Sequence, residues 1–423
     1  MADCAGGGFI GRGATQLKLV TASPPGRNRR LDVLRCVAVV LVMIHHAGIS
    51  SFFTRVGWIG VDLFFVLSGF LISGLLFGEY QKHGSINFKR FVIRRGLKIY
   101  PAFYTFLILT AVVPYGARRM QSLDPSHFPL STPVRYLHEI FFVQNYYRGV
   151  WDHSWSLAVE EHFYIFLPIL LLVFARFASN QKDPFRILPA AWLAIATVGV
   201  ISRGFSVYTG TPNFHMAYTA SHERMDSLFF GVLLGYLHHF RPASLENFMQ
   251  SNRHRIAIAL TSTALLSTTW FFTRNDRFFA TFGYSFVYLG FGGVLLLSLY
   301  VQGILPSGLA PAARGLGKAM AFAGMYSYSI YLWHSPCGVW LPGLLRRTVH
   351  FPTGEYGRFA VYFVGTFAVG IMMSRLIEYP VLRLRDRLFP AAPITKVQTD
   401  PVPAVATVLG ADAIPSALHR FHA

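Results

Sequence analysis

The sequence predicts an all-α fold: a polytopic membrane protein built as a helical bundle, with about ten transmembrane helices. Of its 423 residues, 53% are hydrophobic and only 13% are charged, and the mean hydropathy is +0.42. Soluble globular proteins carry roughly 25% charged residues, so this chain has too few charged side chains to cover a surface in water. The composition excludes an ordinary soluble enzyme and a disordered chain. The three cysteines are too few for a disulfide framework or a structural zinc site.

Ten stretches of the chain are candidates for crossing a bilayer, which takes about 20 mostly apolar residues. Backbone groups in lipid must find hydrogen-bond partners within their own segment, so helices are expected. The stretches do not alternate between apolar and polar residues as the strands of a membrane barrel do. The expected spans lie near residues 33–50, 58–78, 99–117, 157–176, 187–203, 226–240, 256–272, 280–301, 319–341 and 359–377.

The basic residues predict how the chain is oriented. The net charge is +19, and most of the 38 Lys and Arg residues lie in segments that are cytoplasmic if both termini are cytoplasmic. This positive-inside pattern predicts a multi-pass protein of the inner (plasma) membrane. No basic domain is separate from the spans, so a nucleic-acid partner is not expected. The predicted organisation is a basic tail at 1–30, a membrane domain at 31–388 and a C-terminal tail at 389–423.

The first expected span carries a cation near one end and a histidine near the other. Arg35 and His46 are 11 positions apart. On a helix this places them about 20° apart around the axis and about 16 Å apart along it. A histidine is able to act as a general base near neutral pH. The alternative is an interfacial His45–His46 pair that is hydrogen-bonded to water.

Carboxylates at the mouths of two further spans are candidates for supporting such a base. Asp62 opens the second span within a run rich in Gly and Ser, and Glu160 lies four residues before Tyr164 at the start of the fourth. A carboxylate orients and charge-stabilises the histidine of a catalytic triad. The alternatives are a structural cation partner for Asp62 and a helix N-terminal role for Glu160. Small residues such as Gly69 and Ser73 are typical of close helix packing.

Five basic residues gather at the start of the third span: Lys89, Arg90, Arg94, Arg95 and Lys98. An Arg side chain holds phosphate in a bidentate fork, so the cluster fits a phosphate-rich ligand. The alternative is an anchor for anionic lipid. The residues alone leave both interpretations open.

Other polar residues in apolar stretches are costly in lipid and are therefore candidates for function. Candidates for acceptor contacts or structural support are Trp155, Ser156, Tyr164, Arg224, Asp226 and His334. Ion pairing is the plainer interpretation for Arg224, Asp226 and Glu378, and packing is the plainer one for His334. No His/Cys group has the spacing of metal ligands, so no metal is expected. No phosphate loop or dinucleotide fingerprint is present.

Five sequence blocks, taken in order, resemble the acyltransferase-3 family of integral membrane acyltransferases, which includes O-antigen acetylases, the Nod-factor acetylase and macrolide acylases. Arg35 and His46 match the family signature of Arg or Lys, ten residues, then His. The others are Gly-Val-Asp-Leu-Phe-Phe-Val-Leu-Ser-Gly-Phe-Leu-Ile, Arg-Arg followed by Tyr-Pro, Trp-Ser-Leu-x-x-Glu-Glu-x-Phe-Tyr and Ser-Tyr-Ser-x-Tyr-Leu-Trp-His. The likeness runs from about Arg30 to Arg387. The chain departs from the usual residue at three places: glycine is replaced by Val33, arginine by Lys98 and glutamine by His162.

The resemblance implies an O-acyltransferase that takes an acyl group, often acetyl, from cytoplasmic acyl-CoA to a sugar hydroxyl. His46 would be the catalytic base, with Glu160 or Asp62 as its support. Arg35 and the basic cluster would bind the donor. No permanently bound cofactor is implied. A proton-coupled transporter or flippase of a lipid-linked or acidic solute is the alternative, because intramembrane His, Asp and Glu also serve proton relays.

Overall fold

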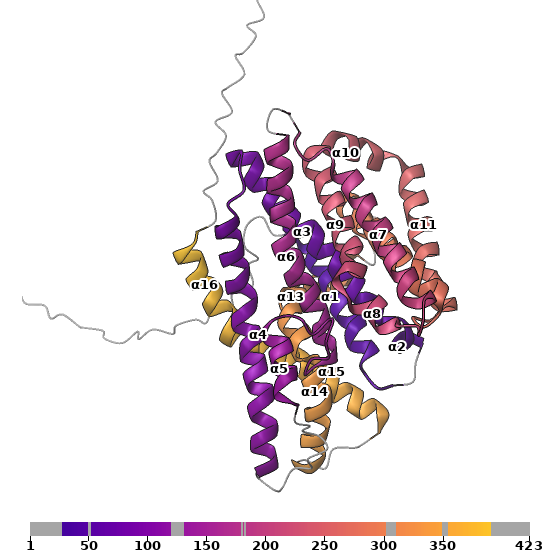
Figure 1. Cartoon of the computed structure of the whole chain (residues 1–423). Coiled ribbons are helices and arrows are strands. Elements are labelled where there is room, and N and C mark those ends of the chain that lie inside the picture. The colour runs from indigo at the N-terminus through magenta and orange to yellow at the C-terminus, as the bar shows by residue number, and fades with distance from the viewer. Residues whose placement is uncertain are drawn as a thin grey trace, which may run out of the picture.

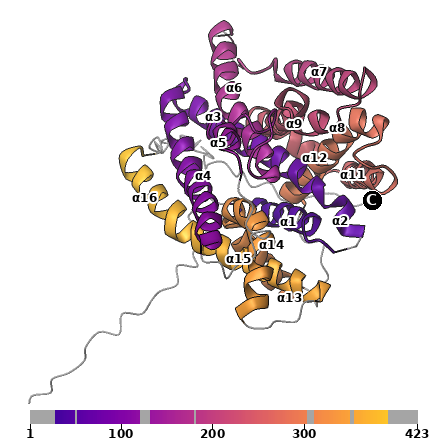
Figure 2. The same ribbon diagram turned by 60° about the horizontal axis from the view of Figure 1, so that its bottom comes forward.

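The computed structural model describes residues 28–49, 52–119, 131–178, 181, 183–301, 310–348 and 354–390. Within this part of the chain all regular structure is helical, and the helices pack into one bundle (Figure 1 and Figure 2). The expected fold class is therefore confirmed. Most of the tails expected at 1–30 and 389–423 lies outside the described residues.

Helices cover each of the ten expected spans, with two helices on the ninth, near 319–341. These helices are α1 (Arg29–His45), α3 (Gly60–His83), α4 (Phe88–Arg119), α6 (Trp155–Phe177), α7 (Leu188–Tyr208), α9 (Ser221–Phe240), α11 (Asn252–Phe271), α12 (Tyr284–Tyr300), α13 (Ala310–Met325), α14 (Ser327–Thr348) and α15 (Glu355–Met373). The shorter helices are α2 (Phe52–Val56), α5 (Pro133–Ile140), α8 (Phe214–Thr219), α10 (Pro242–Gln250) and α16 (Tyr379–Leu388).

Six stretches of the described chain are long and apolar enough to cross a membrane. They are Thr54–His83, Phe88–Tyr115, Asp152–Phe177, Leu188–Tyr208, Phe279–Tyr300 and Glu355–Leu388. The protein is thus a multi-pass membrane protein, while the expected count of about ten spans is not confirmed.

The stretch expected as one span near 319–341 is divided into two helices at Tyr326. α13 packs against α1, whereas α14 packs chiefly against α15. In the last turn of α13, a Cβ at Gly324 would lie 1.8 Å from the carbonyl oxygen of Asp32, so the two backbones are in close contact there. Each half of the stretch packs against a different neighbouring helix. The expectation of a single continuous helix here is therefore wrong.

α3 and α9 pack with their backbones in direct contact. A Cβ at Gly69 would lie 1.9 Å from the carbonyl oxygen of Leu228, and one at Gly231 would lie 2.3 Å from that of Val66. Small residues permit this approach between helices in a membrane. The structure therefore confirms that Gly69 permits close helix packing, as expected.

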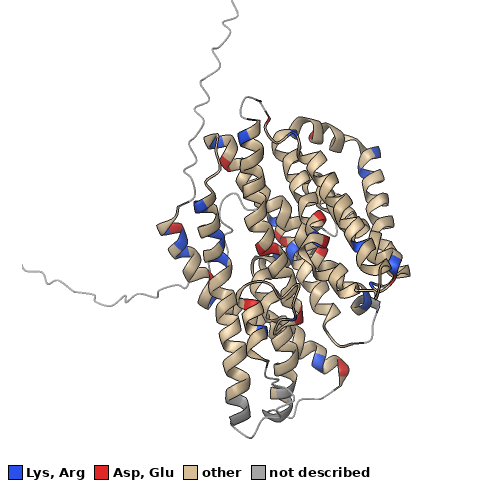
Figure 3. Ribbon diagram, in the orientation of Figure 1, with Lys and Arg blue, Asp and Glu red and all other residues tan. Residues whose placement is uncertain are grey.

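Two buried ion pairs join α3, α7 and α9. Arg224 of α9 donates a hydrogen bond to Asp62 of α3, and Arg203 of α7 donates to Asp226 of α9 across 2.9 Å. All four side chains are almost fully buried. Figure 3 shows charged positions in the middle of the bundle as well as at its ends. A buried charge without a partner is costly, so these pairs fix how the three helices sit together.

A buried carboxylate holds the segment between α4 and α6. Glu139 of α5 accepts hydrogen bonds from the backbone N–H groups of Val150 and Trp151 and from the hydroxyl of Ser154, at 2.8–3.2 Å. Burial raises the pKa of Glu139 to about 7. The three hydrogen bonds fix the turn that leads into α6.

We expect Gly231→Ala to lower the thermal stability of the protein, because a Cβ there would displace the α3 backbone at Val66. Gly78→Ala is the matched control on α3, where a new Cβ meets nothing within 4 Å. Since Ala is the better helix former by roughly 1 kcal/mol, the Tm of Gly78→Ala should hold or rise slightly. Thermal unfolding in detergent measures both. Equal Tm values for the two variants would contradict the close α3–α9 contact.

The contribution of Glu139 to the free energy of unfolding should fall as the pH rises from about 4.5 to about 7. In this window the folded Glu139 keeps its proton while the unfolded one, with an ordinary pKa of 4.5, loses it. Glu139→Gln replaces the carboxyl by a neutral group of the same shape and should remove this contribution. The Tm of the variant, relative to wild type, should therefore increase from about pH 5 to about pH 8. Parallel pH profiles of Tm would show that Glu139 does not titrate in this range.

Candidate active site

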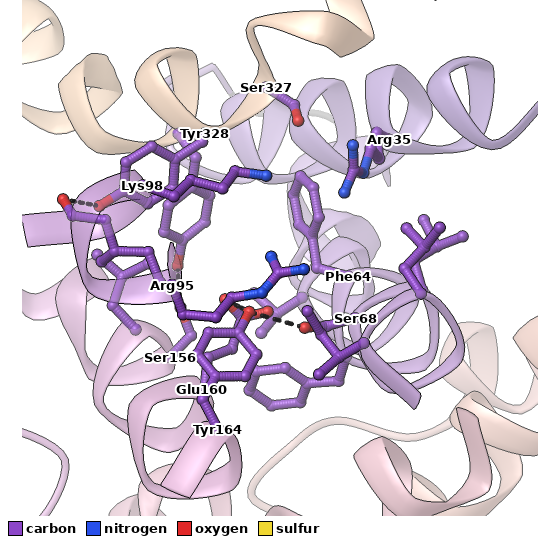
Figure 4. Close-up of a pocket in the computed structure, with 18 of the residues that line it drawn as sticks. Arg35, Phe64, Ser68, Arg95, Lys98, Ser156, Glu160, Tyr164, Ser327 and Tyr328 are labelled. Atoms are coloured by element: carbon purple, nitrogen blue, oxygen red, sulfur yellow. Dashed lines mark hydrogen bonds between the residues drawn. The ribbon is translucent and has the colours of Figure 1, made fainter. Parts of the chain in front are cut away.

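A cavity of about 320 Å³ lies between α1, α3, α4, α6 and α14. Its walls are largely apolar and aromatic, with a small number of charged side chains. In Figure 4, Arg35 reaches in from α1, while Arg95 and Lys98 reach in from α4 on the opposite side. A concave, mainly apolar site with a few converging polar groups is typical of ligand binding.

The helical period divides the basic cluster of α4 into two groups. Arg95 and Lys98 are three residues apart, share a face of the helix and line the cavity. Together with Arg35 they place three basic side chains around one space.

The other basic residues of the cluster lie outside the cavity. Arg90 pairs with Glu79 at 2.6 Å, and Arg94 pairs with Asp386 of α16 at 3.0 Å. Lys89 is exposed. The cluster that the sequence presents as one unit therefore has two tasks: one part lines the cavity, and the other links α4 to its neighbours.

Two carboxylates also line the cavity. Glu160 of α6 accepts a hydrogen bond of 3.1 Å from the Tyr164 hydroxyl, which is itself 2.9 Å from the hydroxyl of Ser68. Glu378 lies in the π-helical turn 374–378 between α15 and α16 and accepts hydrogen bonds from two serine hydroxyls at 2.8 and 3.1 Å. An ion pair was the plainer interpretation for Glu378, but in the described residues its hydrogen-bond donors are these serines.

Tyr331 and Ser156 form the wall of the cavity that faces a group of histidines. The Tyr331 hydroxyl donates to the carbonyl oxygen of His153 across 2.8 Å and lies 2.6 Å from the Ser156 hydroxyl. Beyond the cavity, the Tyr331 ring contacts the rings of His153 and His334, with centroids 5.6 and 5.4 Å apart. Tyr331 therefore borders both the cavity and these two histidines.

Three histidines that are distant in sequence form a row behind Tyr331. The ring centroids of His46 and His334 are 4.9 Å apart, and those of His334 and His153 are 4.5 Å apart. His334 and His153 are buried. His46, which caps the C-terminal end of α1, is exposed. The row therefore runs from an accessible imidazole into the interior of the bundle.

Each of the three rings lies against a backbone carbonyl oxygen through one nitrogen. For His46 this is Nδ1, which is 2.9 Å from the carbonyl oxygen of Val42. His334 also uses Nδ1, and His153 uses Nε2. A carbonyl oxygen only accepts hydrogen bonds, so the nitrogen beside it carries the proton of the neutral ring. The other nitrogen, Nε2 in His46, presents a lone pair.

Neither carboxylate expected to support His46 is placed beside it. Asp62 is paired with Arg224, and Glu160 lines the cavity. In the described residues, the hydrogen-bond partner of the His46 ring is Val42.

The remaining residues singled out in the sequence take structural positions near the site. Trp155 is buried against Phe65, a cavity-lining residue, and against Tyr218, with ring centroids 5.9 and 4.7 Å apart. Arg224 and Asp226 form ion pairs as expected, each with a partner on a neighbouring helix.

Sequence reasoning missed three residues of this region: His153, Tyr331 and Arg203. His153 lies two residues before the Trp-Ser-Leu block, and Tyr331 lies within the block rich in Tyr, so both stand beside a recognised motif. Arg203 lies at the end of an apolar stretch, where an ionisable residue is itself a signal of a partner or a function.

Comparison with known proteins places most of the chain in one family. The family model described as "Acyltransferase domain" matches residues 28–375. The peptidoglycan O-acetyltransferase OatA of Listeria monocytogenes is 26% identical over 369 residues, which cover 83% of this chain and 55% of that protein. A putative O-acetyltransferase of Staphylococcus aureus strain COL is 29% identical over 324 residues, which cover 72% of this chain and 49% of that protein.

This chain spans about half the length of these curated relatives. No solved structure matches it. The matched region contains the α1 cation, the α4 cations and all three histidines of the row. On the extent of the family match, the chain belongs to the acyltransferase-3 family.

Proposed function

We propose that this protein transfers an acyl group, acetyl in the first instance, from acyl-CoA to a hydroxyl group of a carbohydrate. The observation that carries the proposal is the placement of two groups on one helix. Arg35 lines the cavity near the start of α1, and His46 ends the same helix with an accessible imidazole. The names of the relatives support O-acetylation, and one of them names peptidoglycan as the acceptor.

The cavity suits acyl-CoA, the proposed donor, in charge and in polarity. Arg35, Arg95 and Lys98 match the phosphates of CoA in charge, and the two guanidinium groups also match them in shape. The apolar and aromatic walls suit the pantetheine arm. In this arrangement the thioester lies beside Tyr331 and Ser156, where the acceptor oxygen held by His46 has to meet it.

His46 acts as the base. Its Nε2 takes the proton of the acceptor hydroxyl while the oxygen attacks the carbonyl carbon of the thioester, a role that typically contributes about 10²–10⁴-fold in rate. The carbonyl of Val42 holds Nδ1–H and so keeps Nε2 free as the base. We therefore assign the orientation of His46 to Val42, in place of the expected Glu160 or Asp62.

The basic ends of α4 and α16 lie side by side in Figure 1 and Figure 3. We place this end of the bundle, and with it both termini, at the cytoplasmic face of the inner (plasma) membrane, following the positive-inside pattern. The donor then enters from the cytoplasm. His46, at the other end of α1, meets a glycan such as peptidoglycan from the opposite side.

Replacing His46 by Gln should abolish transfer without weakening donor binding, because His46 is not among the residues that line the cavity. The assay is transfer from radiolabelled acetyl-CoA to soluble peptidoglycan disaccharides by protein in nanodiscs. We expect a loss of about 10²-fold or more in rate with an unchanged Kd for acetyl-CoA.

His162→Gln is the matched control and should stay active, since His162 contacts Ser221 instead. Wild-type turnover by His46→Gln would remove it from the mechanism, and a wild type that neither binds nor uses acetyl-CoA would refute the donor.

Arg95→Gln should weaken acetyl-CoA binding by about tenfold or more, because a hydrogen bond to a charged group contributes about 1.5–3 kcal/mol. Arg94→Gln is the matched control one residue away, because Arg94 is paired with Asp386 outside the cavity. Titration of both variants with acetyl-CoA separates the two roles. Equal loss of affinity in both variants would argue against specific donor contacts within the cavity.

A further inference from the structure

An arginine near the proposed base has no task in the mechanism described so far. Arg274 lies in the segment 272–278, between α11 and the π-helical turn 279–283, and its side chain is half-buried. Its positive charge acts on the imidazole rings of His45 and His46. Arg274 is therefore within reach of an acceptor whose hydroxyl meets His46.

Hydrogen bonds hold the segment 272–278 close to the end of α1. His45 Nδ1 lies 2.6 Å from the carbonyl oxygen of Thr54 in α2. The next residue, Arg55, donates to the carbonyl oxygen of Trp270, in the last turn of α11, across 3.2 Å. α2 and this end of α11 lie at the same edge of the bundle in Figure 1 and Figure 2. The fold itself therefore places the segment beside the proposed base.

Tyr218 of α8 carries the guanidinium group of Arg274. The guanidinium carbon lies 4.7 Å from the centroid of the Tyr218 ring, which is a cation–π contact. The same ring packs against Trp155, with centroids 4.7 Å apart, and Trp155 directly precedes Ser156 in the cavity wall. Tyr218 thus links Arg274 to the part of the cavity in which the thioester is proposed to lie.

No acidic side chain pairs with Arg274 in the part of the chain that the structure describes. Asp276, two residues away, accepts hydrogen bonds from the backbone N–H and the hydroxyl of Thr273 instead. Asp152, whose charge also reaches the proposed base, lies 3.9 Å from Arg148. The guanidinium group of Arg274 is therefore held in place without an anion to balance it.

A second guanidinium group near the same ring shows the contrast. Arg224 lies 5.4 Å from the centroid of the Tyr218 ring, but it is buried and is ion-paired with Asp62. Arg224 is thus part of the frame of the bundle. Arg274 remains open to a ligand, and its planar fork of N–H groups matches a carboxylate in charge and in shape.

We propose that Arg274 binds a carboxylate of the acceptor, so that the protein selects an acidic sugar and holds its hydroxyl at His46. The inference rests on the proposed function and names the chemical class of its acceptor. Arg274 is a specificity-determining residue in this account: it positions the acceptor, and the acyl transfer itself is unchanged.

The test compares two acceptors that differ by one charge. The disaccharide N-acetylglucosaminyl-N-acetylmuramic acid carries a free carboxylate, and its methyl ester is neutral. The protein is held in nanodiscs of phosphatidylcholine, which supply no anionic lipid, with saturating acetyl-CoA. Wild-type kcat/KM should be about tenfold or more higher for the acid than for the ester. Arg274→Gln should use both acceptors alike, near the wild-type value for the ester, and Arg274→Lys should keep part of the preference because it keeps the charge but loses the fork.

Arg277→Gln is the matched control. Arg277 lies three residues further along, is exposed, and contacts the ring of Tyr208 at 5.7 Å, so this variant should keep the wild-type preference. Each preference is a ratio measured on one preparation, so it does not depend on the fraction of protein that folds. A wild type that uses acid and ester equally, or an Arg274→Gln variant that loses activity equally with both, would overturn the inference. Failure of the proposed function reads differently, because the wild type then acetylates neither acceptor.

Discussion

The contact between α3 and α9 is the constraint on which the site depends. Helices in lipid gain little from hydrophobic attraction, so their arrangement is set by close packing and by paired polar groups. Here the backbones meet at Gly69 and Gly231, and the Asp62–Arg224 pair joins the same two helices. α3 in turn supplies one wall of the cavity, including Ser68, which faces Tyr164 of α6.

Beside the packed helices α3 and α9, α1 acts as a rigid spacer. A helix keeps the cation at Arg35 and the imidazole at His46 on nearly one face, about 16 Å apart along the axis. In the proposed function, donor binding and bond-making are therefore assigned to opposite ends of one helix: charge is matched at Arg35, and the proton is taken up at His46. Tyr331 lies at the edge of the cavity and contacts the two buried histidines.

Features that depend on one segment were predictable from the sequence, and features that join distant segments were not. Hydropathy located a helix at every expected span, and helical spacing correctly placed Glu160 beside Tyr164. The break at Tyr326 was not visible, because it follows from a contact between α13 and α1. The pairing of Asp62 with Arg224 joins positions 162 residues apart, which no periodicity encodes.

The same limit explains the basic cluster of α4. Spacing alone separates Arg95 and Lys98 from Arg90 and Arg94, but it does not say which pair faces a cavity. That depends on Asp386 of α16, which lies 292 residues from Arg94. The row of histidines is similar: each ring is ordinary in its own segment, and the row exists only when α1, α14 and the turn before α6 meet.

The helical run from Glu355 to Leu388 changes character at its π-helical turn. Its first part, α15, has 19 residues and is about 28 Å long at 1.5 Å per residue, which matches a hydrocarbon core of about 30 Å. α16, beyond the π-helical turn, carries Arg383, Arg385, Asp386 and Arg387 and so lies past the apolar part of the run. That turn carries Glu378 into the cavity wall. The chamber therefore takes one of its acidic side chains from the boundary between the apolar and the charged part of the run.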